Sequence, residues 1–271
     1  MKLSCLPVSL FGDICSGKYP LAKWAKYAQS LGLDGYDVST MFFPNHTPAA
    51  LIELKAELAD IDIPMLMATD YPDFTNPDAN ERRRQLDFIK RNIALISCFG
   101  VRYMRITAGM NHPGMDFDAA VEHVVECFAD IAPTAESYGV ELVFENHAKP
   151  GAWPIVDFSF DPRAFFAVCE RMKGLPIGVN FDTANACACG EKPDEMLKRA
   201  MPYVKTIHMN DTSTVGYLTS VLIGTGLVNF DDVFRLIDAS GFNGWVCIEE
   251  AGMGHEESIR KAVEFARKYV R

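Results

Sequence analysis

The sequence predicts a single-domain (β/α)8 barrel over residues 1–271, with helices packed around a closed parallel sheet. Eight short apolar runs alternate with eight longer amphipathic stretches, which is the pattern of strand–helix–strand units. Dividing 271 residues among eight such units leaves about 34 residues for each, an ordinary size. Hydrophobic residues make up 49% of the chain and charged residues 23%, which is enough apolar material for one core.

The apolar runs place the expected strands in order along the chain. They are 3–10, 35–39, 63–69, 101–107, 140–146, 177–182, 204–210 and 245–250. The amphipathic stretches between them predict helices at 20–31, 47–60, 77–98, 117–137, 161–172, 191–200, 230–240 and 256–270. No composition shift or low-complexity tract divides the chain, so one domain is the simpler interpretation.

Local signals support these boundaries. Three pairs place a capping residue before a proline that suits a first helical turn: Thr47-Pro48, Asn76-Pro77 and Asp161-Pro162. Four glycines end a helix just before the next strand: Gly32, Gly139, Gly174 and Gly241. An open, doubly wound sheet is disfavoured because residues 10–17 lack the glycine fingerprint of a dinucleotide site.

Charge and cysteine usage exclude several classes of function. The formal net charge of −10 opposes binding to a phosphate backbone, so we expect no nucleic-acid partner. No apolar run is long enough to span a membrane, and the apolar run at the start is too short for a signal peptide. The eight cysteines are scattered through helix and strand patterns, which favours free thiols in the cytoplasm.

Four consecutive late strands end in residues that can ligate a metal. These are Glu145, Asp182, His208 and Glu249, separated by 37, 26 and 41 residues, or about one unit each. They therefore belong to one rim, the C-terminal face where barrel enzymes place their chemistry.

Strand alternation predicts which way these side chains point. In the run 177–182, Ile177, Val179 and Phe181 share the apolar outer face, which turns Asp182 inward. The same alternation turns the other three inward, although it leaves Lys205 on an apolar face. Three carboxylates and an imidazole at one point would repel without a cation. We therefore expect one divalent ion, with Mn²⁺, Mg²⁺, Co²⁺ and Zn²⁺ all open.

The second half of the chain also resembles a known family. Five motifs carry the resemblance: Phe144-Glu145-Asn146-His147, Phe181-Asp182-Thr183-Ala184-Asn185, Ile207-His208-Met209-Asn210-Asp211, the run 224–230 and the run 244–250. Over about residues 138–271 the sequence is similar to the sugar phosphate isomerase/epimerase family, within the xylose isomerase-like TIM barrel superfamily. The resemblance implies a TIM barrel with one catalytic divalent ion held by the four strand-end residues.

Two positions depart from that family. Epimerases of the family often carry a histidine where this chain has Asn185, and many members carry a lysine where it has Asn210. An amide can hydrogen-bond a sugar hydroxyl, but it cannot stabilise negative charge as an ammonium does. The departures leave the ligand set intact and leave the reaction open.

Four further rim residues are predicted to contact substrate: Arg105, His147, Asn185 and Asn210. Arg105 has an equal alternative, a structural pairing with an inner acid such as Glu141. His147 is expected not to point with Glu145, and to reach a substrate from the loop.

The resemblance implies an isomerase or epimerase of a sugar or related hydroxy-ketone. Glu145 and Glu249 would then exchange a proton at the carbon next to a metal-bound carbonyl. The alternative is a lyase on the same barrel, a dehydratase of keto-cyclitol or dehydroshikimate type. A barrel that binds ligand without turnover is less favoured, as is a DNA endonuclease. We expect a small carbohydrate or polyol-derived substrate and no membrane partner, and the sequence leaves a homo-oligomer open.

Overall fold

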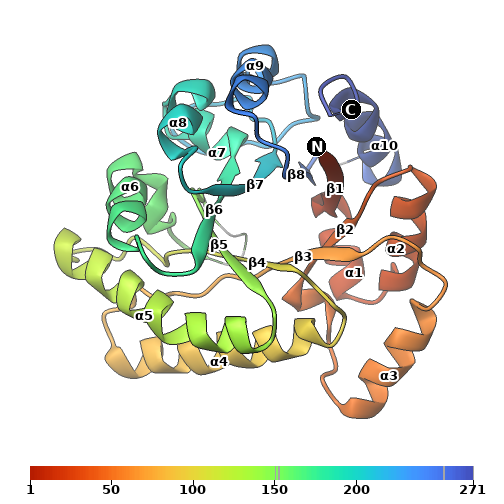
Figure 1. Ribbon diagram of the computed structural model, residues 1–271, viewed down its shortest axis with the longest axis horizontal. Coiled ribbons are helices and arrows are strands. Elements are labelled where there is room, and N and C mark those ends of the chain that lie inside the picture. The colour runs from red at the N-terminus through yellow and green to blue at the C-terminus, as the bar shows by residue number, and fades with distance from the viewer. Residues whose placement is uncertain (150, 152, 253, 271) are drawn as a thin grey trace.

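The computed structural model describes residues 1–149, 151, 153–252 and 254–270. Eight parallel strands form a nearly closed barrel, so the predicted (β/α)8 fold is confirmed (Figure 1). The strands are β1 (Lys2–Pro7), β2 (Tyr36–Ser39), β3 (Met65–Thr69), β4 (Tyr103–Ile106), β5 (Glu141–Glu145), β6 (Ile177–Asp182), β7 (Val204–Met209) and β8 (Trp245–Glu250). Their hydrogen-bonded order is β1-β8-β7-β6-β5-β4-β3-β2, which leaves one seam between β1 and β2.

Hydrogen bonds close this seam from both sides. The Asp34 N–H, just before β2, donates to the Leu3 carbonyl oxygen of β1 at 2.8 Å. Inside the barrel, the Ser4 hydroxyl donates to the Asp37 carboxylate at 2.7 Å. The eight strand ends therefore form one ring, and the rim at their C-terminal ends is continuous.

The predicted helices are present outside this ring (Figure 1). They are α2 (Leu21–Ser30), α3 (Pro48–Glu57), α4 (Ala79–Ser97), α5 (Phe117–Ser137), α6 (Pro162–Arg171), α8 (Pro193–Ala200), α9 (Phe230–Ser240) and α10 (His255–Ala266). Short helices α1 (Phe11–Cys15) and α7 (Thr183–Ala188) and three 3-10 turns, η1 (Val8–Leu10), η2 (Thr40–Phe42) and η3 (Phe158–Phe160), were not predicted. Among the described residues, no helix is both long and apolar enough to cross a bilayer.

Several predicted boundaries are wrong by two to four residues, and two of them have a clear local cause. The first strand ends at Pro7 rather than residue 10, because the chain there turns into η1 and α1. Helix α4 begins at Ala79, two residues later than predicted, because Asp78 rather than Asn76 is its N-cap. The Asp78 carboxylate accepts the Asn80 N–H at 2.8 Å. The four predicted helix-ending glycines all have positive φ angles, between 68° and 93°.

The core has two parts, as the alternation along the strands predicts. Outward side chains such as Phe144, Val179 and Phe181 pack in one large cluster with the helices. Inward side chains such as Val143 and Cys247 form a smaller cluster inside the barrel. Below the rim the barrel interior is therefore filled by side chains.

Lys205 does not fit the simple alternation because the sheet is irregular at this residue. Val179 pairs with Val204 and Asn180 with Thr206, so Lys205 is an extra residue without a partner on β6. A Cβ on Gly178 would overlap the Lys205 side chain, so the glycine makes room for it. The bulge keeps the following residues of β7 in register with β6.

Candidate metal centre

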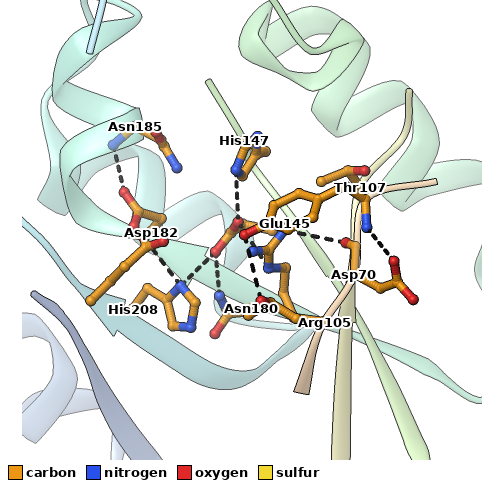
Figure 2. A network of polar contacts seen from close by, with 12 residues as sticks. Asp70, Arg105, Thr107, Glu145, His147, Asn180, Asp182, Asn185 and His208 are labelled. Carbon is orange, nitrogen blue, oxygen red and sulfur yellow. Dashed lines mark hydrogen bonds and ion pairs between the residues drawn. The ribbon is translucent and has the colours of Figure 1, made fainter. Parts of the chain in front are cut away.

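The four strand-end residues converge at the C-terminal rim. Glu145 and Asp182 are the last residues of β5 and β6, and His208 and Glu249 are next to last in β7 and β8. One potential ligand atom from each lies within 4.8 Å of the others. The side chains of Glu145 and His208 are fully buried, whereas that of Glu249 is 13% exposed. The predicted inward orientation of these residues is confirmed, and Figure 2 shows Glu145, Asp182 and His208 pointing toward one another.

The ionisable groups of this cluster strongly shift one another's pKa values. His208 Nδ1 lies 2.8 Å from Glu145 Oε1 and 3.5 Å from Glu249 Oε2. Burial lowers the pKa of His208, but the two carboxylates outweigh it and raise that pKa to about 10. Burial, together with the charges of Glu249 and Glu145, raises the pKa of Asp182 well above its usual range. Without a cation, the cluster therefore holds additional protons.

A divalent cation fits this donor set. Carboxylate oxygens and one imidazole are suitable ligands for Mn²⁺, Mg²⁺, Co²⁺ or Zn²⁺. Glu145 Oε2 is buried and has no hydrogen-bond partner among the described residues, a costly state that a cation would relieve. The four groups would supply three negative charges once their protons have left.

Arg105 supplies the buried positive charge of the site. Its side chain is fully buried on β4, and its Nε lies 3.4 Å from Glu145 Oε2. Its guanidinium also lies 4.5 Å from the centre of the Tyr71 ring. The predicted alternative, a pairing with an inner acid, is present, but the acid is Glu145 and not Glu141, which pairs with Arg102 at 3.0 Å. Tyr71 was not a candidate from the sequence, although it follows a strand end at this rim.

His147 points into the same site (Figure 2). The side chain is 8% exposed, and its Nε2 lies 3.8 Å from Glu145 Oε2. The expectation that it turns away from Glu145 is therefore wrong. Residues two apart in an extended chain share a face, and that rule would have found it. Burial lowers the pKa of His147 to about 4, so its imidazole is neutral at pH 7. Its contact with a substrate stays a prediction.

Two asparagines predicted to bind substrate lie beside the carboxylates. Asn210 Nδ2 donates to Glu249 Oε2 at 3.1 Å and to Asp182 Oδ2 at 3.5 Å. Its Oδ1 accepts the Asp211 N–H at 2.8 Å. The backbone N–H of Asn185 donates to Asp182 Oδ1 at 2.6 Å, which caps α7. Asn185 Oδ1 is buried without a hydrogen-bond partner in the described chain. For both residues, substrate contact stays a prediction.

Two further asparagines were missed by sequence reasoning. Asn180 Nδ2 donates to Glu145 Oε1 at 2.6 Å, and its Oδ1 accepts the Thr206 hydroxyl at 2.7 Å. The Asn146 amide pairs with both backbone groups of Asp182, at 2.8 and 2.9 Å. Only their positions in the sequence could have indicated them: Asn180 lies on the inner face of its strand, and Asn146 directly follows a strand.

The loop between β7 and α9 is organised by Asp211. Its carboxylate accepts backbone N–H groups at 2.8–3.1 Å from Thr212, Gly224, Gly226 and Val228. A Cβ at Gly226 would overlap both the Asp211 carboxylate and the Thr212 carbonyl oxygen. The glycine in this motif therefore allows the loop to approach the carboxylate closely.

Comparisons with known proteins agree with this architecture. The model of the family described as xylose isomerase-like TIM barrel matches residues 25–269. Inosose dehydratase 1 of Bacillus cereus (strain ZK / E33L) is 22% identical over 150 residues, 49% of this chain and 47% of that protein. The chain thus spans about half the length of the curated dehydratases it matches.

Two solved structures show the same fold. A D-tagatose 3-epimerase-like protein superposes with a TM-score of 0.79 at 15% identity, covering 100% of this chain and 97% of the other. The IOLI protein with a bound zinc atom superposes with a TM-score of 0.77 at 19% identity, covering 99% and 96%. At these identities the likeness concerns the fold.

Proposed function

This chain belongs to the xylose isomerase-like TIM barrel family, and we propose that it is a divalent-metal-dependent isomerase or epimerase of a small sugar or related hydroxy-ketone. The observation that carries the proposal is the convergence of Glu145, Asp182, His208 and Glu249 within 4.8 Å at the C-terminal rim. Polar residues at that rim are typical of catalytic sites in this fold. The epimerase-like neighbour supports the assignment through its fold.

The four clustered residues would hold one Mn²⁺, Mg²⁺, Co²⁺ or Zn²⁺ ion. Such an ion supplies Lewis-acid chemistry, which favours loss of a proton next to a carbonyl. The zinc atom in the IOLI neighbour, which shares this fold, supports the presence of a metal. Asn210 and Asn146 would keep the carboxylates in place through the hydrogen bonds described above.

Glu145 and Glu249 would move the proton. Burial raises the pKa of each carboxyl group, but the positive charge of Arg105 beside Glu145, and the hydrogen bond between His208 and Glu249, outweigh it and hold both pKa values below their ordinary range. Both are therefore ionised at neutral pH, as a base must be. One would accept the proton from the carbon beside the carbonyl. The other, ionised at rest, would first take up a proton from solvent. Delivery of that proton to the opposite face of the same carbon is epimerisation, and delivery to the neighbouring carbon is isomerisation.

The charge of the site favours an uncharged substrate. Three carboxylates, the Arg105 guanidinium and a divalent ion together leave no net charge. A phosphate or carboxylate on the substrate would need a further cation. At the position where many members of the family carry a lysine, this chain has the neutral Asn210. We therefore propose a free ketose or a cyclitol ketone.

A dehydratase is the second candidate. The curated relatives that match this chain include inosose dehydratases. His147 is neutral and lies 3.8 Å from Glu145, so it would hydrogen-bond an expelled hydroxyl group, and the glutamate that took the proton from carbon would supply the proton that releases it as water. Both reactions begin with the same proton abstraction.

Metal content and solvent-deuterium exchange test the proposal. Wild type should hold about one ion per chain after loading with Mn²⁺, and Asp182→Ala should lose most of it. Glu145→Gln should abolish deuterium incorporation into ketoses and cyclitol ketones. Glu141→Gln, at the exposed start of the same strand, is the matched control and should retain it.

The products separate the candidate reactions. An isomerase or epimerase leaves label in recovered sugar without loss of water, whereas a dehydratase creates a conjugated product with new ultraviolet absorbance. Wild type that binds no ion even after loading would contradict the metal mechanism. Full exchange in Glu145→Gln would remove that residue from proton transfer.

A further inference from the structure

A chain of three buried side chains crosses three strands beneath the metal centre. Glu145 on β5 pairs in register with Asn180 on β6, which in turn pairs with Thr206 on β7. The Thr206 hydroxyl donates to Asn180 Oδ1 at 2.7 Å, and Asn180 Nδ2 donates to Glu145 Oε1 at 2.6 Å. All three residues have no solvent exposure (Figure 2 shows Asn180 and Glu145).

Both ends of the Asn180 amide are therefore assigned. The carboxylate of Glu145 accepts hydrogen bonds only, so it needs the NH₂ end of the amide. The Thr206 hydroxyl uses the carbonyl end as its acceptor. Turning the amide over would place its oxygen against a carboxylate oxygen in a buried site, which is unfavourable. The threonine thus holds the amide in the one orientation that serves Glu145.

An amide orients the carboxylate without changing the charge of the site. Arg105 approaches Glu145 Oε2 and Asn180 approaches Oε1, so the two carboxylate oxygens have different partners. An aspartate at position 180 would add a fourth buried negative charge and would repel Glu145. A hydrophobic residue would free the Glu145 side chain to take other rotamers.

We propose that Asn180 and Thr206 are positioning residues, which fix the orientation of Glu145 for metal binding. This inference rests on the proposed function, because it assigns Glu145 as a ligand. Residues that hydrogen-bond the ligands of a metal commonly contribute to metal affinity, and their removal weakens binding by about 10–100-fold. Thr206 is the sharper probe, since it touches Glu145 only through Asn180.

The test compares three threonine substitutions by calorimetric titration with Mn²⁺. Thr206→Val removes the hydroxyl with little change of volume, and Mn²⁺ affinity should fall by about tenfold. Thr206→Ser keeps the hydroxyl and should bind like wild type. Thr107→Val is the matched control, because that buried hydroxyl donates to the Pro72 carbonyl oxygen instead (3.1 Å). Asn180→Asp should weaken binding more than Thr206→Val does.

Thermal unfolding of the metal-free variants separates positioning from a purely structural role. If Thr206→Val and Thr107→Val lower the melting temperature alike and only Thr206→Val loses affinity, the proposal is supported. Wild-type affinity in a folded Thr206→Val protein would overturn it and leave the proposed function standing. If wild type itself binds no Mn²⁺, the proposed function fails and the positioning role fails with it.

Discussion

Two arginine–glutamate pairs link the region of β4 to β5, and they differ mainly in burial. Arg102, directly before β4, meets Glu141 at 3.0 Å, with side chains 57% and 45% exposed. Arg105 meets Glu145 at 3.4 Å, with both side chains fully buried. Replacing each arginine by methionine therefore compares the same loss of charge in two environments.

We expect the two substitutions to lower the free energy of unfolding by amounts that differ several-fold. Removing one partner of a buried ion pair leaves an uncompensated charge and costs about 3–5 kcal/mol. Removing an exposed pair costs about 0–1 kcal/mol. Glu145 keeps Asn180 and His208 as partners in Arg105→Met, so we expect about 3 kcal/mol there. The measurement is urea unfolding of metal-free protein at pH 7, followed by circular dichroism.

The pH dependence checks the assigned cause. In wild type, burial raises the pKa of Glu145, but Arg105 and His208 outweigh it and hold the pKa below the ordinary 4.5. This stabilisation is present above pH 4.5 and is lost as the pH falls. In Arg105→Met, protonation of Glu145 removes the unpaired charge. The difference in the free energy of unfolding between this variant and wild type should therefore become smaller toward pH 4. An equal cost for Arg102→Met and Arg105→Met, or a difference that widens in acid, would refute this reasoning.

Two other predictions concern the metal centre and its neighbouring loop. Burial lowers the pKa of His208, but the charge of Glu145 outweighs it and raises that pKa to about 10, so the imidazole is protonated at pH 7 in the metal-free protein. Because a metal binds the neutral imidazole, Mn²⁺ binding at pH 7 should release about one proton or more. Calorimetry in two buffers of different ionisation enthalpy measures this release, and a buffer-independent enthalpy would contradict it. Gly226→Ala should destabilise the protein by about 1–3 kcal/mol, because its Cβ would overlap Asp211. Gly12→Ala, inside α1 with open space around it, should be neutral or slightly stabilising in the same unfolding assay.

The fold and the four converging residues could be predicted because their signals are local. Strand alternation has a period of two, and successive strand ends are separated by about one barrel unit, so Glu145 and Asp182 are predicted to lie on the inner face of the same rim. The start of α4 could not be predicted as well, since Asn76 and Asp78 are both good caps. The orientation of Lys205 could not be predicted for another reason: a bulge depends on the register with a neighbouring strand.

The polar network around the four residues depends on register across strands, and a single sequence does not show register. Arg105 lies three residues after Arg102, and only the pairing of β4 with β5 decides which glutamate each one meets. Asn180 reaches Glu145, and Thr206 reaches Asn180, because each pair is directly opposite in the sheet.

The bulge at Lys205 bears directly on this network. If β7 paired with β6 without a bulge, Val204 would stay opposite Val179, and Lys205 rather than Thr206 would lie opposite Asn180. The same shift of one position would move His208 out of its pairing with Asp182. Since a shift of one residue turns each side chain of a strand to the other face, the imidazole would leave the barrel interior. One irregularity near the floor of the barrel therefore brings both His208 and the hydroxyl that holds Asn180 to the inner face.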